Sequence, residues 1–202
     1  MRARRQAQLY RILIRVISRH PFLHYYQGLH DIVTVLLLVL DDEDATARAT
    51  EALALYFIRD AMHPSLEPVM QQMRIILPII KNEDRDIYAL MAECELHPYF
   101  CLSYIISWFS HDLTAFDDVC RLFDLFLSSN PAMPIYCSAA IVLRRKEELM
   151  DCERDFAMVH SMLSKLPRDD SVGEWVRDAV RLARRYPIES IAGMTGWTFD
   201  PK

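Results

Sequence analysis

Apolar residues recur every three or four positions along most of this chain, which is the spacing of one face of an α-helix. The chain has only four glycines in 202 residues, and no turn signal joins alternating apolar runs into a hairpin. The pattern predicts an all-α domain of about eight to ten helices. The expected helical stretches are residues 9–17, 29–40, 41–62, 69–80, 84–95, 100–111, 115–128, 134–150, 153–166 and 174–186.

Prolines mark the expected interruptions of this pattern. Pro21 ends the first helix, and Pro78 predicts a kink or break in the apolar stretch around it. Glycine and proline also punctuate the last residues of the chain, after Pro187. We therefore expect one helical domain over residues 1–187 and a loose tail over residues 188–202.

The composition excludes several classes of function. A net charge of −5 offers no basic face for nucleic acid, and we expect no nucleic-acid partner. The longest apolar run, Ile32–Leu40, is far shorter than the ~20 residues of a membrane span, so we expect none in this chain. His20 and His24 are separated by a proline, and no Cys/His cluster occurs, so we expect no metal site.

One short motif lies between the first two predicted helices, where residues 25–28 read Tyr-Tyr-Gln-Gly. A purely structural interpretation is available, because two aromatic residues can anchor the backbone before a glycine that permits a tight turn. The functional interpretation depends on segments further along the chain. These are Ile-Ser-Trp-Phe-Ser-His at residues 106–111 and Arg-Leu-Phe-Asp-Leu-Phe-Leu at residues 121–127.

Together these segments resemble the TBC-domain family, the GTPase-activating proteins of Rab GTPases. The resemblance covers about Leu9 to Leu163 and implies a single TBC-type domain built wholly of helices. Residues 23–28 and 131–136 look closest to the branch that acts on Rabs of the early secretory pathway. That likeness implies a role in vesicle transport between the ER and the Golgi, in the cytoplasm or at those membranes.

The resemblance also implies roles for single residues. In the family the glutamine of Tyr-x-Gln-Gly is a catalytic finger that enters the GTPase. In this sequence the corresponding glutamine is Gln27. Tyr25, Tyr26, Gly28 and Asp31 are then expected to support the turn that carries the finger. No cofactor of the chain's own is expected, because GTP and Mg²⁺ belong to the partner Rab.

A second finger of the family is an arginine in an upstream Ile-x-x-Asp-x-x-Arg motif, and these 202 residues contain no such motif. The chain therefore looks N-terminally truncated relative to the family. Two hypotheses follow. The first is a Rab GTPase-activating domain whose own activity is weakened by the missing arginine. The second is a catalytically deficient scaffold that binds a GTPase or another partner without activating it.

The remaining motif residues have mainly structural interpretations. Trp108 and Phe109 are expected in the core. Arg121 and Asp124 are three apart on one predicted helix, where a surface ion pair is the plain interpretation and the resemblance suggests that they hold helices together. A later group of arginines is interpreted as a solvated face, with peripheral contact to an anionic membrane as the alternative: Arg177, Arg181, Arg184 and Arg185.

Overall fold

The structure is a computed structural model that describes residues 2–167, 171–191 and 193. This part of the chain is helical and contains no β-strand, so the all-α class is confirmed. The helices are α1 (Arg2–Arg19), α2 (Leu29–Leu40), α3 (Glu43–Tyr56), η1 (Arg59–Met62), α4 (Glu67–Met73), α5 (Ile76–Glu83), α6 (Arg85–Glu93), η2 (Pro98–Cys101), α7 (Leu102–Ser107), α8 (Phe116–Leu127), α9 (Met133–Arg144), α10 (Lys146–Asp151), α11 (Phe156–Leu163), α12 (Val172–Arg185) and α13 (Ile188–Ile191).

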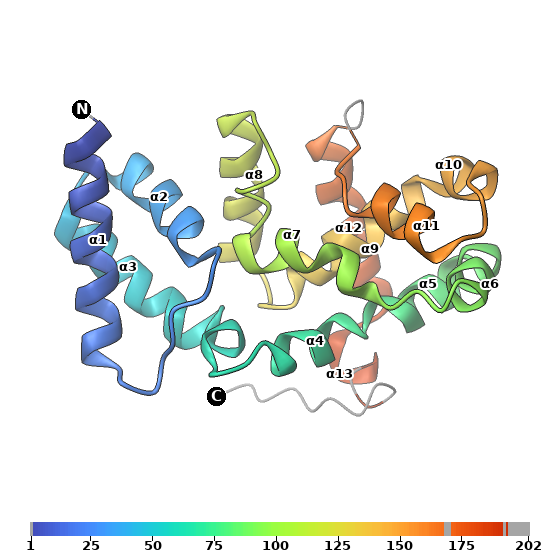
Figure 1. Ribbon diagram of the computed structural model, residues 1–202, viewed down its shortest axis with the longest axis horizontal. Coiled ribbons are helices and arrows are strands. Elements are labelled where there is room, and N and C mark those ends of the chain that lie inside the picture. The colour runs from blue at the N-terminus through green and yellow to red at the C-terminus, as the bar shows by residue number, and fades with distance from the viewer. Residues whose placement is uncertain (1, 168–170, 192, 194–202) are drawn as a thin grey trace.

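The helices form an elongated array in which α1, α2 and α3 make one end and α10 and α11 lie at the other (Figure 1). α7 crosses the centre, and α8 rises beside it (Figure 1). α9 is buried over most of its length, and α12 packs along it. Within the described part of the chain, no helix is both long enough and apolar enough to cross a bilayer.

More helical segments form than the eight to ten expected. The predicted stretch 41–62 contains a separate 3-10 segment, η1, and another, η2, overlaps the start of stretch 100–111. α13 follows the last stretch, and two other stretches each divide into two α-helices. The first divides between α4 and α5 at Arg74 and Ile75, ahead of Pro78. Pro78 itself lies in the first turn of α5, where a backbone N–H has no partner within the helix, so it starts that helix rather than kinking it. The second divides at Arg145, between α9 and α10.

Arg145 explains the second division. Its guanidinium is buried, and Nη1 donates hydrogen bonds of 2.8 Å to the carbonyls of both Met162 and Lys165 at the end of α11. The same group donates to Glu148. The chain turns at Arg145, and the buried cation binds carbonyls at the negative, C-terminal end of α11.

The acidic segment before α3 begins that helix as predicted. Asp42 is the N-cap, and its side chain accepts a hydrogen bond of 2.6 Å from the backbone of Ala45. The acidic residues that follow pair with the basic face of α1. Arg11 donates two bonds, of 2.8 and 2.7 Å, to Glu43, and Arg19 lies 3.1 Å from Glu51. The arginines of α1 thus fasten α1 to α3.

The expected loose tail needs correction at its first four residues. Residues 188–191 form α13, and Ile188 and Ile191 are both buried. The Tyr136 hydroxyl of α9 donates a 2.6 Å hydrogen bond to the carbonyl of Tyr186 just before this helix. The packed domain therefore continues past residue 187. The rest of the expected tail, apart from Gly193, lies outside the described residues.

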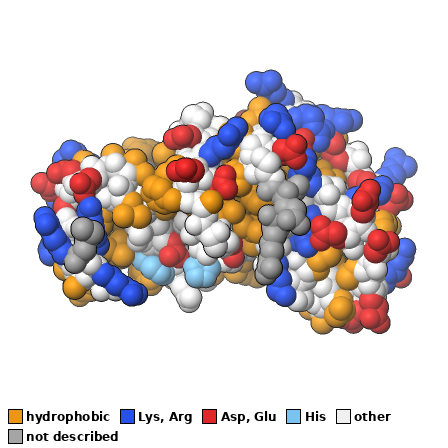
Figure 2. Space-filling model, turned by 90° about the horizontal axis from the view of Figure 1, so that it is seen from above, with side chains coloured by type: hydrophobic (Ala, Val, Ile, Leu, Met, Phe, Trp, Pro, Cys, Tyr) orange, Lys and Arg blue, Asp and Glu red, His pale blue; other side chains and the backbone are white. Residues whose placement is uncertain are grey.

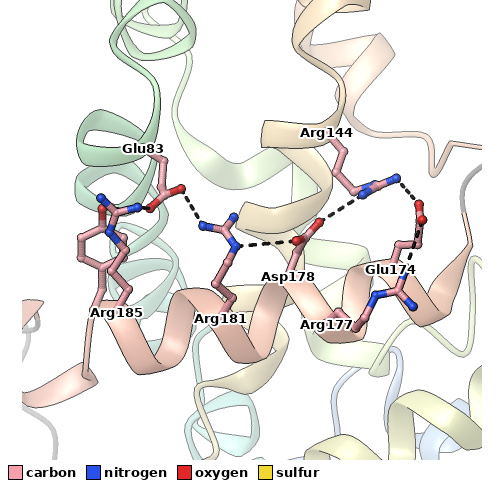
Figure 3. A network of polar contacts seen from close by, with 8 residues as sticks. Glu83, Arg144, Glu174, Arg177, Asp178, Arg181 and Arg185 are labelled. Carbon is pink, nitrogen blue, oxygen red and sulfur yellow. Dashed lines mark hydrogen bonds and ion pairs between the residues drawn. The ribbon is translucent and has the colours of Figure 1, made fainter.

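A polar network joins α12 to α5 and α9 (Figure 3). Glu83, at the end of α5, lies 3.0 Å from the Arg181 guanidinium and 2.8 Å from that of Arg185. The Tyr186 hydroxyl donates a 2.9 Å bond to the same carboxylate. Burial alone would raise the pKa of Glu83, but the bonds from Arg181 and Tyr186 and the nearby arginine charges outweigh it, and the pKa is lowered.

We expect Glu83→Gln to lower the free energy of unfolding by about 1–2 kcal/mol at pH 7, because it removes the charged acceptor of three donors. A lowered folded-state pKa means that this stability is present above the ordinary glutamate pKa of about 4.3 and is lost as pH falls through the folded value. Urea unfolding from pH 7 to pH 3 measures the difference.

The matched control is Glu93→Gln, because Glu93 forms an exposed pair with Arg154. We expect that change to cost no more than about 0.5 kcal/mol at any pH. If Glu83→Gln lowered the free energy of unfolding as much at pH 3 as at pH 7, the stabilisation would not depend on the charge of Glu83.

Candidate functional site

The segment between α1 and α2, residues 20–28, carries the Tyr-Tyr-Gln-Gly motif and is held to its neighbours by its backbone. Leu23 donates a 2.9 Å hydrogen bond to the carbonyl of His20, and His24 donates one of 2.8 Å to the carbonyl of Met62. The Leu23 side chain is buried in the core. The segment is therefore anchored before the motif begins. We call residues 25–28 the finger turn.

Tyr26 and Gly28 fasten the finger turn to a single carbonyl at the end of α7. The buried Tyr26 donates a 2.9 Å hydrogen bond from its hydroxyl to Ile106 O, and burial raises its pKa. Gly28 has φ 124°, a backbone conformation that residues with a side chain rarely adopt. A Cβ at Gly28 would lie 3.3 Å from Ile106 O and 3.3 Å from the Tyr26 ring. Only glycine lets the turn approach α7 so closely.

Gln27 lies between these two anchored residues and is exposed. Its side-chain amide makes no hydrogen bond with any other described residue. The backbone on both sides of Gln27 is fixed, while the amide itself, which can donate and accept hydrogen bonds at once, remains available to a partner. The arrangement presents one polar group on a rigid support, as the functional interpretation of the motif requires.

A cluster of polar residues lies beside the turn. The exposed Tyr25 has its hydroxyl 3.0 Å from His30 Nδ1, and Asp31 lies 3.5 Å from His30 Nε2 and 3.5 Å from His111 Nδ1. Two histidine side chains lie near one another, with acidic side chains beside them, on the face seen in Figure 2. Burial, and the negative charge of Asp31, raise the pKa of Tyr25.

The end of α7 is fixed by the predicted aromatic residues. Trp108 and Phe109 are buried as expected, and both have left-handed backbones, with φ 53° and 65°. Trp108 occupies the helix C-terminal position that glycine usually takes. Its ring meets Phe123 edge-on at 5.2 Å and Phe126 at 5.4 Å, so α8 holds the strained end of α7 in place.

Arg121 and Asp124 do not form the expected pair among the contacts of the described residues. Both side chains are exposed on α8. The Arg121 guanidinium instead lies over the start of α12, 3.2 Å from where a Cβ would stand at Gly173. Arg121 thus lies against a second helix, while the Asp124 side chain is exposed at the surface.

The sequence did not single out His30, His111 or Ile106 as parts of this site. His30 and His111 lie 81 positions apart and belong to no metal or catalytic spacing, and the contribution of Ile106 is a backbone carbonyl, which no side-chain pattern reveals. The sole signal was the presence of Ile106 and His111 inside the quoted segment 106–111.

Residues 2–150 match the model of the Rab-GTPase-TBC domain. The chain belongs to this family. TBC1 domain family member 20 of Homo sapiens is 38% identical over 187 residues, which is 93% of this chain and 46% of that protein. The GTPase-activating protein gyp10 of Schizosaccharomyces pombe is 35% identical over 189 residues, or 92% of this chain and 50% of that one.

The TBC fold is also shared with a solved structure, the Ypt/Rab-GAP domain of Gyp1p, at a TM-score of 0.73 and 20% identity over 90% of this chain and 66% of that one. At that identity the likeness shows the fold alone. This TBC chain spans about half the length of the curated relatives it matches. Their sequence similarity continues beyond residue 150, as does the packing of α12 on α9.

We expect Gly28→Ala to destabilise this TBC domain by about 1–3 kcal/mol, because alanine is strained at φ 124° and its methyl group would press on Ile106 O. Urea unfolding measures the loss. Gly193→Ala is the matched control, since no atom lies within 4 Å of a Cβ there, and its effect should stay within about 0.5 kcal/mol. Equal effects of the two changes would contradict the proposed contact.

Proposed function

We propose that this chain is a GTPase-activating domain for a Rab GTPase and that Gln27 enters the active site of the bound Rab. The observation that carries the proposal is the exposed amide of Gln27, unpaired among the described residues, on a turn whose neighbours are clamped to α7. Membership of the Rab-GTPase-TBC family supports the choice of partner. So do relatives whose names describe GTPase-activating proteins.

The chemistry fits a glutamine amide. GTP hydrolysis requires a water molecule oriented in line with the bond to the γ-phosphoryl group. The amide oxygen of Gln27 would accept a hydrogen bond from that water, and the amide N–H would donate to a phosphoryl oxygen. The group forms no bond in the reaction. Its contribution is to reduce the entropy lost on orienting the water, which requires a rigid turn.

We infer that these 202 residues alone accelerate hydrolysis weakly, because they hold no Ile-x-x-Asp-x-x-Arg motif. An arginine finger is worth about 10³–10⁵ in rate, which corresponds to about 4–7 kcal/mol of transition-state stabilisation. Arginines of α1 supply no obvious substitute, since Arg11, Arg15 and Arg19 all pair with carboxylates of α3.

The alternative function is a scaffold of the same fold that binds a GTPase or another partner without activating it. Such a domain would keep its docking surface, because binding energy comes mostly from a few buried anchors rather than from a finger. The clamped Gly28 and the free amide of Gln27 favour the activator, since a scaffold has no need to hold an unused amide on a strained turn.

The place of action is part of the same proposal. The resemblance to the early secretory branch, and TBC1 domain family member 20 among the relatives, favour vesicle transport at ER and Golgi membranes, with the domain in the cytoplasm. Peripheral membrane contact through α12 has weaker support. Arg181 and Arg185 pair with Glu83, and Arg177 pairs with Glu174, so much of the positive charge there is already balanced.

We expect Gln27→Ala to reduce the acceleration of GTP hydrolysis by about 100-fold or more, the cost of removing one oriented polar group from such a site. The measurement is single-turnover hydrolysis over a panel of GTP-loaded Rabs. To raise the signal, it uses a chimaera in which the Ile-x-x-Asp-x-x-Arg segment of a family member precedes Met1. Rab binding should change little.

Gln71→Ala, an exposed glutamine on α4, is the control and should leave the rate unchanged. If Gln27→Ala left the hydrolysis rate of the chimaera unchanged, the catalytic role would have to lie outside the finger turn. Rab binding by a chimaera that never accelerates hydrolysis would favour the scaffold. Full activity of the 202 residues alone would contradict the inference about the missing arginine.

A further inference from the structure

The finger turn makes contacts on two sides, one buried and one exposed, and the contacts on the exposed side include two histidines. On the buried side, Tyr26 and Gly28 meet Ile106 O. On the exposed side, polar contacts run from Tyr25 OH to His30 Nδ1 at 3.0 Å, from His30 Nε2 to Asp31 Oδ1 at 3.5 Å, and from Asp31 Oδ2 to His111 Nδ1 at 3.5 Å. These four side chains connect the turn, α2 and the loop that follows α7.

We propose that Asp31 and His111 are positioning residues for Gln27, and that this chain of contacts forms a clamp in which the Asp31–His111 contact strengthens when His111 is protonated. The inference rests on the proposed function of Gln27. We call the set of Tyr25, His30, Asp31 and His111 the histidine clamp. It acts through the backbone of the turn, since none of its members except Tyr25 lies within the turn itself.

The geometry gives each group a defined hydrogen-bonding role. In neutral His30 with its proton on Nε2, that nitrogen faces the Asp31 carboxylate and Nδ1 accepts a hydrogen bond from the Tyr25 hydroxyl. A second proton on His30 would make Nδ1 a donor to the Tyr25 oxygen. The His30 and Tyr25 rings are stacked, with centroids 6.4 Å apart. Asp31 divides its two oxygens between the two histidines. Asp31 therefore links α2 to the loop that carries His111, and its loss would release that link.

Protonation of His111 should tighten the clamp. A cationic imidazole is attracted to a carboxylate more strongly than a neutral one, so a proton gained by His111 strengthens its contact with Asp31. The other charged group facing the clamp is Asp112, which is partly buried and accepts a 3.0 Å hydrogen bond from Ser103. Burial raises the pKa of Asp112. In its ionised form Asp112 adds to the attraction for His111.

Hydrogen exchange of the free protein tests the clamp without any Rab. Compared at equal pH, Asp31→Asn should speed exchange of the backbone amides of residues 25–29 by about tenfold, because local opening becomes easier. His111→Leu should act similarly. His111→Asn keeps a donor near the position of Nδ1 but cannot gain charge, so it should preserve part of the protection and lose the part of its pH dependence that His111 supplies.

The difference between wild type and His111→Asn should therefore increase as pH falls from 8 to 6. A merely structural role of His111 would give a difference independent of pH, and that result would overturn the proposal. The control is His160→Gln on α11, at the opposite end of the molecule (Figure 1), which should leave exchange at residues 25–29 unchanged.

Single-turnover hydrolysis with the activating chimaera and the Rab that responds best adds the functional readout. Asp31→Asn and His111→Leu should lower the maximal rate about tenfold with little change in the Rab concentration at half-saturation, as expected for a misplaced but still docked finger. If exchange responds as expected but no Rab is hydrolysed faster, the proposed function fails and the clamp stands. If hydrolysis depends on Gln27 but exchange is indifferent to Asp31→Asn, the clamp alone fails.

Discussion

The carbonyl of Ile106 is the point on which this site depends. It accepts the Tyr26 hydroxyl and lies 3.3 Å from the place where any residue larger than glycine would project at position 28. Residues about 80 positions apart are thereby fixed against one another by a hydrogen bond and a steric limit. The finger turn can keep its conformation only if the end of α7 keeps its own conformation. The rigidity of the site therefore depends on how the end of α7 is packed.

The packing at the end of α7 requires a strained backbone. Trp108 and Phe109 both adopt left-handed conformations, which cost of order 1–3 kcal/mol each for residues with large side chains. Burial of two aromatic side chains offsets such a cost, because each removes roughly 150–250 Å² from water. The rings of Phe123 and Phe126 on α8 meet Trp108 edge-on, and Phe126 also lies 6.0 Å from the Phe109 ring, so α8, α7 and the finger turn form one continuous support. Trp108, Phe109 and the aromatic residues of α8 therefore support the finger turn and, through it, Gln27.

The sequence predicted the helical class and the course of most helices because apolar spacing reports which face of a helix is buried. It also predicted that Trp108 and Phe109 would be buried, and it singled out Gln27, which the structure places at the surface. It missed the division at Arg145, because the cause is a hydrogen bond to carbonyls of α11 that no local pattern contains. It missed the pairing of Asp31 with His111 for the same reason. Contacts between distant segments are set by the tertiary fold.

Several arginines of this domain are paired with carboxylates and are therefore not placed to take part in the proposed hydrolysis of GTP. Arg11, Arg15 and Arg19 of α1 pair with α3, and Arg181 and Arg185 of α12 pair with Glu83 of α5, so these basic residues tie helices together. A guanidinium held by a carboxylate is poorly suited to stabilise charge on a phosphoryl group, because the pairing must first be broken. In the proposed mechanism Gln27 orients the water, and the positive charge for the transition state comes from a group that no carboxylate already holds.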